Sequence, residues 1–265
     1  MNIVQFEVKR NLKTTIIWAV IVTLAGLLYT AMGPSFIDQS ETLIAFMSGM
    51  GEDFLNGLGV NLDTFFSPIG FFAYVGGFIA LALCVQAMIY GIKAFALEKN
   101  NKSLEFLYTK PNSRTNIFVQ KYVSNIILLL LTQVLVIASL YIATDLVNTM
   151  SYDHSLMLIM LLTFVPLQGL FFTLGTIIGT SVSRLKSVVS VAMGVTLGMF
   201  FINMLAGVVG SDPLGYASFF NYYNLSDIAF NEAYDTTFVL ISVGLMIGFT
   251  VISLIIFNKK DMKIT

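Results

Sequence analysis

Six long runs of apolar residues, none of which contains a charged side chain or a histidine, constrain this chain more than any other feature of its sequence. Each run can cross the hydrocarbon core of a bilayer, about 30 Å thick, which takes about 20 helical residues. Because a segment in lipid must satisfy its own backbone hydrogen bonds, and no strand-like alternation is visible, the runs are predicted to be helices. They cover residues 14–32, 69–92, 122–144, 155–180, 187–209 and 237–257.

We therefore expect an all-α integral membrane protein with six transmembrane helices in a single transmembrane domain, residues 1–265. The composition agrees, since 57% of the residues are hydrophobic, 11% are charged and the mean hydropathy is +0.84. These values lie far from the averages of soluble domains. The first run is expected to be retained rather than cleaved as a signal peptide, because it is long, lacks an Ala-x-Ala site and precedes five more spans.

The basic residues give the predicted orientation. All fourteen fall in segments that a six-helix topology puts on one side of the membrane. They are Lys9, Arg10, Lys13, Lys93, Lys99, Lys102, Lys110, Arg114, Lys121, Arg184, Lys186, Lys259, Lys260 and Lys263. The opposite loops, at about 34–68, 145–154 and 211–236, contain none, yet they hold eleven of the fifteen acidic residues. Since Lys and Arg near membrane segments stay in the cytoplasm, both termini are predicted to be cytoplasmic.

Motifs for catalysis and for metal binding are missing. The sequence has neither the phosphate loop G-x-x-x-x-G-K-[ST] nor a G-x-S-x-G elbow. Its one histidine, His154, is expected in a solvated outer loop, and its one cysteine, Cys84, is expected to be buried in the second span. We expect no catalytic residue, metal, cofactor or nucleic-acid partner in this chain. An ion-coupled carrier would need ionisable residues inside its spans. The ionisable residue that comes nearest to this, Lys93, lies at a helix end.

A few polar and small residues do lie within the spans. Gln86, Gln133, Gln168 and Asn203 either line a pathway or form hydrogen bonds between helices, and the sequence leaves both readings open. Pairs of glycines at four-residue spacing indicate close helix–helix or subunit contacts. They are Gly175 with Gly179 and Gly194 with Gly198. Pro166 is expected to kink the fourth span, because it lacks a backbone N–H.

Three segments outside the spans have amphipathic patterns. Residues 1–13 form a basic amphipathic stretch that suits the inner leaflet. The outer loop at 34–68 suggests short amphipathic helices that gate the bundle or dock on it. The segment 98–114 puts Leu104, Leu107 and Tyr108 on one helical face and ends its helix before Pro111. That helix either docks into a groove on a cytoplasmic partner or lies on lipid.

The segment 98–114 also carries a resemblance to a known family. Its Glu98, its run Ser103-Leu104-Glu105-Phe106-Leu107, its Pro111 and its Ser113-Arg114 closely resemble the loop between the second and third helices of ABC-2 type transporter permeases. That loop has the pattern Glu…(Gly)-Thr-Leu-Glu-x-Leu-Leu…Pro-x-Ser-Arg. Here Lys102 stands where the family often has Gly and Ser103 where it often has Thr. The six helices, the long first outer loop and the basic N-terminus extend the resemblance to the whole chain.

The resemblance implies a permease subunit of a bacterial ABC exporter in the plasma membrane. Two permeases, identical or paralogous, would join a cytoplasmic dimer of separate ATPase chains that bind ATP and Mg²⁺. Residues 1–13 would form an elbow helix on the inner leaflet, and 98–114 would be the coupling helix that contacts the ATPase. The implied coupling residues are Glu98, Ser103, Leu104, Glu105, Leu107, Tyr108, Pro111, Ser113 and Arg114.

The cargo and one alternative role stay open. We expect a hydrophobic or amphipathic peptide, a drug or a lipid-like molecule, in keeping with export or with resistance to antimicrobial peptides or drugs. The chain could instead serve a sensing or resistance complex without transporting anything, using the same ATPase-docking helix. An ion-coupled carrier is disfavoured, because the spans lack the clustered ionisable residues that it would need.

Overall fold

A computed structural model gives the fold and describes residues 3–96, 113–147, 151–182 and 185–259. In this part of the chain the regular elements are all helices, and six of them are long and apolar enough to cross a membrane, which confirms the predicted number. The spans are α1 (Ile3–Asp38), α5 (Pro68–Ala96), α7 (Arg114–Val147), the pair α8 (His154–Leu162) and α9 (Phe164–Ser181), α10 (Val188–Val209) and α14 (Thr236–Lys259).

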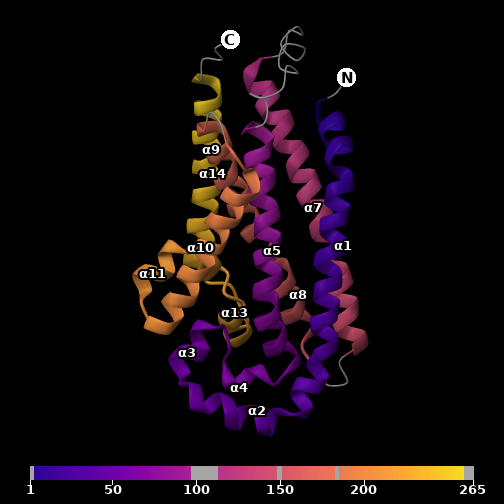
Figure 1. Ribbon diagram of the computed structural model, residues 1–265, viewed down its shortest axis with the longest axis vertical. Coiled ribbons are helices and arrows are strands. Elements are labelled where there is room, and N and C mark those ends of the chain that lie inside the picture. The colour runs from indigo at the N-terminus through magenta and orange to yellow at the C-terminus, as the bar shows by residue number, and fades with distance from the viewer. Residues whose placement is uncertain (1–2, 97–112, 148–150, 183–184, 260–265) are drawn as a thin grey trace.

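The long helices run side by side along the longest axis of the molecule (Figure 1). The start of α1, the end of α14 and the helix ends that flank residues 97–112 all lie at one end, which we call the loop end. The short helices α2, α3 and α4 lie at the opposite end, which we call the outer end. That the loop end faces the cytoplasm stays a prediction from the basic residues.

The first helix differs from the expected arrangement. Residues 3–13, expected to form a separate elbow, are instead the first turns of α1, which continues unbroken to Asp38. No glycine or proline interrupts the sequence between residues 3 and 25, so nothing ends the helix at residue 13. Its 36 residues reach about 54 Å, well beyond a core of about 30 Å. Part of α1 therefore extends outside the hydrocarbon.

The start of α7 also differs from the expected boundary at residue 122. Its first two turns carry the charged residues Arg114 and Lys121, so a search for uncharged runs leaves these turns out of the predicted span. Arg114, which was expected at the end of the coupling segment, is the first residue of α7. In the fourth span, the helix is interrupted at Thr163, between α8 and α9. The interruption fits Pro166, because the missing N–H of a proline leaves the carbonyl four residues earlier, at Leu162, without its helical partner.

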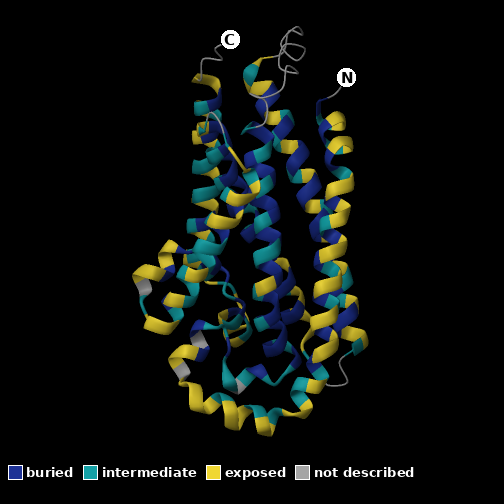
Figure 2. Ribbon diagram, in the orientation of Figure 1, coloured by how far each residue is buried: buried dark blue, intermediate teal, exposed yellow. Residues whose placement is uncertain are grey.

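Helix α5 lies at the centre of the bundle. It packs against α9 along its length and also against α1, α10 and α13, while α1 pairs with α7 and α14 pairs with α9. Figure 2 shows buried residues concentrated on α5 and exposed ones on α1 and the outer helices. The exposed faces carry large apolar side chains, such as Leu28, Val134, Phe201 and Leu240, as expected for surfaces in lipid.

Glycines make the contact between α5 and α9 unusually close. A Cβ atom at Gly175 would lie 2.7 Å from the Met88 carbonyl oxygen, and one at Gly179 would lie 2.7 Å from that of Ile92. From the other side, a Cβ at Gly91 would collide with the backbone of α9 at Phe172. These three glycines let the two backbones touch, as small residues do at membrane helix interfaces.

The other glycine pair has a different environment. Cβ atoms at Gly194 and Gly198 would meet no atom within 4 Å, so this face of α10 packs against nothing in the described part of the chain. The same four-residue spacing thus occurs once at a tight crossing and once on an open face.

Among the described residues, seven short helices build the outer end. Four follow α1: α2 (Ser40–Met47), the 3-10 helix η1 (Ser48–Met50), α3 (Glu52–Gly57) and α4 (Leu62–Phe65). Three more precede α14: α11 (Asp212–Ala217), α12 (Phe219–Tyr222) and α13 (Leu225–Asn231). Helix α3 docks on α10, where Gly57 lies against Met204 and Val208. Docking on the bundle, one of the two expected roles of this loop, is thus what α3 does.

The glycine contacts predict a sharp difference between two substitutions. Gly91→Ala places its Cβ against the backbone of α9 and is expected to cost about 1–3 kcal/mol of stability, as overpacking does. Gly194→Ala has open space and should be neutral or slightly stabilising. Thermal unfolding of the purified protein in nanodiscs measures both. Equal melting temperatures for the two variants would contradict the close crossing.

Candidate functional site

Most of the predicted coupling helix lies outside the described residues, which leaves Glu98, Ser103, Leu104, Glu105, Leu107, Tyr108 and Pro111 as predictions. Ser113 and Arg114 are described. The Ser113 hydroxyl accepts a hydrogen bond from the Asn116 backbone N–H at 3.2 Å, so this serine caps the start of α7. Arg114 Nη1 donates to the Asn258 carbonyl oxygen at 3.2 Å, and Asn258 Nδ2 donates to Thr115 Oγ1 at 3.1 Å. The start of α7 is therefore bonded to the end of α14.

Three phenylalanine rings fill the space just below these bonds. Phe95 from the last turn of α5 stacks on Phe118 of α7 with ring centroids 4.8 Å apart. Phe257 of α14 lies 5.7 Å from each of the two rings. All three side chains are buried. Close aromatic pairs of this kind add about 0.5–1.5 kcal/mol each beyond their buried area. The two helices that flank residues 97–112 thus share one apolar contact with α14.

A buried ion pair ties the same helix ends to α1. Lys121 Nζ lies 3.5 Å from Glu7 Oε1 and donates to the Ala94 carbonyl oxygen at 3.3 Å, near the end of α5. Glu7 and Lys121 are 4% and 3% exposed, respectively. Glu7 is also paired with Arg10 and accepts from Asn11 Nδ2. Burial makes a charge expensive unless partners surround it, and these partners supply that compensation.

Together these contacts form what we call the loop-end cluster: Glu7, Phe95, Phe118, Lys121 and Phe257. It joins α1, α5, α7 and α14 at the point where the chain leaves for residues 97–112 and returns from them. The sequence pattern did not predict this cluster, because Lys121 looks only like a loop charge. A signal was present, since Glu7, Asn11 and Thr15 recur every four residues and share one face of a helix.

Halfway along the bundle, three of the four polar span residues meet. Gln168 Nε2 of α9 lies 3.3 Å from Gln86 Oε1 of α5, while Gln133 Nε2 of α7 donates to Gln168 Oε1 at 3.0 Å. Gln86 Nε2 in turn donates to Thr132 Oγ1 at 2.9 Å. All three glutamines are at most 2% exposed. We call these residues the glutamine network; it bonds three helices together at their most buried level.

The geometry of the glutamine network favours one of the two open readings. Its side-chain amides form hydrogen bonds to neighbouring helices, for example to the Leu83 and Phe164 carbonyl oxygens, rather than pointing into a cavity. Gln133 Oε1 alone lacks a partner among them. Hydrogen bonds between helices are therefore the better description of this trio. Asn203 is different, because it lies apart from the trio and lines a cavity at the outer end.

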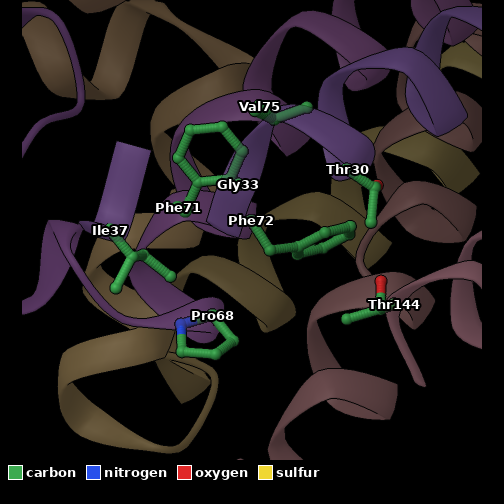
Figure 3. Close-up of a pocket in the computed structure, with 8 residues that line it drawn as sticks. All are labelled: Thr30, Gly33, Ile37, Pro68, Phe71, Phe72, Val75 and Thr144. Atoms are coloured by element: carbon green, nitrogen blue, oxygen red, sulfur yellow. The ribbon is translucent and has the colours of Figure 1, made fainter. Parts of the chain in front are cut away.

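Another pocket near the outer end is too small to matter for a ligand. It lies between α1, α5 and α7, and Figure 3 shows Thr30, Phe72 and Thr144 around it. Its volume is about 10 Å³, at the lower limit for one water molecule.

Neither His154 nor Cys84 forms part of a reactive group. The His154 ring is exposed, with Nδ1 3.3 Å from the Tyr141 hydroxyl and Nε2 4.0 Å from Asp145 Oδ1. Cys84 is buried within α5. Across the described ranges, no three His, Cys, Asp or Glu side chains come together in a group that would hold a metal ion.

Comparison with known proteins gives one clear result. A family model described as "ABC-2 family transporter protein" matches residues 1–262, nearly the whole chain. A search of curated proteins found no match.

Because Glu7 and Lys121 form a buried ion pair, substitutions of the two residues are expected to lower the stability of the protein in a non-additive way. Glu7→Gln is expected to cost about 3–5 kcal/mol, because it removes the carboxylate that the buried Lys121 ammonium contacts. Lys121→Gln is expected to cost less, because Glu7 keeps Arg10 as a charged partner. The double variant should lose less than the sum. Thermal unfolding in nanodiscs measures the cycle, with the exposed Lys9→Gln as a control for lost charge. Strictly additive losses would show that the two side chains do not interact.

Because the glutamine network bonds helices together, a substitution in it is expected to lower stability and to leave cargo selectivity unchanged. Gln168→Leu removes hydrogen bonds to two helices and is expected to cost about 1–2 kcal/mol, whereas the exposed Gln39→Leu should cost nothing measurable. Unfolding experiments test the first part. If Gln168→Leu instead kept full stability but changed which cargo is moved, the residue would belong to a pathway.

Proposed function

Since this chain belongs to the ABC-2 family of transporter proteins and is a membrane permease component of an ABC transporter, we propose that it forms the translocation pathway of an exporter driven by a separate ATPase. The loop-end cluster is the observation that best supports this proposal. It links four spans at the two ends of the segment expected to contact the ATPase. A displacement of that segment is thereby transmitted to α1, α5, α7 and α14.

In this mechanism, closure of the ATPase dimer on ATP displaces residues 98–114 toward the membrane. Leu104, Leu107 and Tyr108 supply the apolar contact with the ATPase. Glu98 and Glu105 supply charge pairing that fixes the register of docking and adds little affinity when exposed. Arg114 was expected to take part in the same charge pairing. Its bond to the Asn258 carbonyl oxygen gives it a second task, which is to keep α14 attached to the moving unit.

The movement then passes along α5. This helix runs from the loop end to the outer end as one unbroken element, Pro68–Ala96. Its glycine contact with α9 is tight, so α9 is expected to follow α5 rather than slide past it. Displacement at residue 96 is therefore felt at Tyr74 and Phe78, about 30 Å away at 1.5 Å per residue.

The other components of the transporter are separate chains, the ATPase and a second permease. ATP and Mg²⁺ bind to the ATPase, since this chain has no phosphate-binding loop. A second permease, identical or paralogous, completes the membrane domain, and the open glycine face of α10 is available for it. We place the assembly in a bacterial plasma membrane, with an amphipathic molecule, a peptide or a drug as cargo.

Substitutions on the predicted contact face test the coupling. Leu104→Ala combined with Glu105→Ala is expected to reduce ATP-driven transport by tenfold or more in proteoliposomes that contain this chain and its ATPase. Leu146→Ala is a matched control, because this leucine is 80% exposed on the opposite end of α7. Unchanged hydrolysis and transport in the double variant would refute the coupling role. ATPase binding without any cargo turnover in the wild type would instead indicate a non-transporting complex.

A further inference from the structure

A cavity at the outer end is not explained by the coupling described above. Its wider part, about 440 Å³, lies between the C-terminal end of α10, helix α13 and the loop around Gly59. A narrower part of about 90 Å³ continues inward between α5 and α10. The two parts adjoin, because Gly59, Gly207, Asn221, Asn224 and Ser226 line both of them. Together they fall within the usual size range of small-molecule sites, about 300–1,000 Å³.

The walls of this outer cavity are held in place. Ser226 Oγ of α13 donates to the Gly59 carbonyl oxygen at 2.8 Å, which closes one side. Ser218 Oγ donates to the Met199 carbonyl oxygen at 2.8 Å and fixes the segment before α12 on α10. Gly57, which precedes this loop, packs directly on α10. The cavity is therefore preformed rather than created by a ligand.

The wider part is polar and carries a negative charge. Asn61, Ser211, Asn221 and Asn224 line it, and Asp227 is the one ionisable residue among its described lining residues. The surrounding outer loops contain eleven acidic residues and neither lysine nor arginine. A field of this sign raises the local concentration of cations and repels anions.

The narrower part is lined by aromatic rings and by polar side chains. Tyr74 and Phe78 of α5, Phe200 of α10 and Phe220 of α12 line it, and the Phe78 and Phe200 ring centroids lie 5.9 Å apart. Asn203 also lines this part, and its Oδ1 atom is buried and has no hydrogen-bond partner. Because this oxygen is enclosed by protein atoms, a ligand would not reach it, but the aromatic faces around the cavity attract cations.

We propose that this outer cavity binds amphipathic organic cations, with the positive charge near Asp227 in the wider part and the apolar body against the aromatic side chains of the narrower part. Both the charge and the shape of the site select this class, since an anion would meet Asp227 and a purely apolar molecule would leave the polar lining unsatisfied. The ligand's identity as cargo rests on the proposed export function, whereas binding itself does not.

Equilibrium binding to the full chain in phosphatidylcholine nanodiscs tests the proposal. Tetraphenylphosphonium and tetraphenylborate form a matched pair of probes, with nearly equal size and opposite charge. The cation should bind saturably with one site per chain, above the level of empty nanodiscs, and the anion should not. Saturable binding of the anion with equal affinity would overturn the proposal.

Two variants place the binding in the cavity. Asp227→Asn removes the charge and is expected to weaken cation binding about tenfold. Gly77→Leu fills the narrower part and should weaken binding at least as much. A Cβ at this position meets no atom within 4 Å, and an unchanged melting temperature in nanodiscs checks that the fold is kept. The matched controls are Glu41→Gln, on an exposed outer helix, and Gly194→Leu, which also has open space.

The outcomes separate this proposal from the proposed function. Wild-type affinity in Asp227→Asn and Gly77→Leu, or an equal loss in Glu41→Gln, would show that the probe binds elsewhere and would overturn the site. Cation binding that depends on Asp227 supports the site even if the ATPase never transports the probe. In that case the export function would fail and the binding site would stand.

Discussion

The backbone contact between α5 and α9 is the interaction on which the rest of this structure depends. In lipid, helices gain no hydrophobic driving force from meeting each other, so close van der Waals packing and internal hydrogen bonds must hold them together. Gly91, Gly175 and Gly179 allow that packing, and the glutamine network adds hydrogen bonds about one to two turns away along the same two helices. The remaining spans are arranged around this pair: α14 on α9, and α1, α7 and α10 on α5.

This arrangement gives the two ends of the bundle different properties. At the loop end, an ion pair, three phenylalanine rings and a hydrogen bond from Arg114 join four helices into one unit. At the outer end, short helices surround a preformed cavity with polar and aromatic walls. Because α5 contributes to both, a displacement of the loop end can change the shape of the outer cavity. The coupling mechanism and the proposed cation site are thus connected through one helix.

Hydropathy was enough to predict the six spans, because lipid leaves a chain few alternatives to uncharged helices. It was less reliable at helix ends. The start of α7 was missed because Lys121 is a charge whose cost is met by Glu7, a partner far away in sequence that no hydropathy window contains. The first span was expected to begin too late for the same reason, since Glu7 and Asn11 look like surface residues until α7 covers them.

Residue type alone could not separate roles that depend on neighbours. Gly175 and Gly194 share a motif, yet only the first meets another backbone. Gln168 and Asn203 are both amides in spans, but one bonds to two helices and the other faces a cavity. The coupling residues from Glu98 to Pro111 stay predictions from the family resemblance.

The central claim, that the loop end moves as one unit when the ATPase closes, is most directly tested by distances between spin labels. With Cys84 replaced by alanine, labels at Val119 of α7 and Ile255 of α14 sit on exposed faces of that unit, and a label at Val189 marks the nearby end of α10. The distance from 119 to 255 should stay constant when ATP and vanadate trap the closed ATPase, while the distance from 119 to 189 should change. A shift between 119 and 255 as large as that between 119 and 189 would contradict the account.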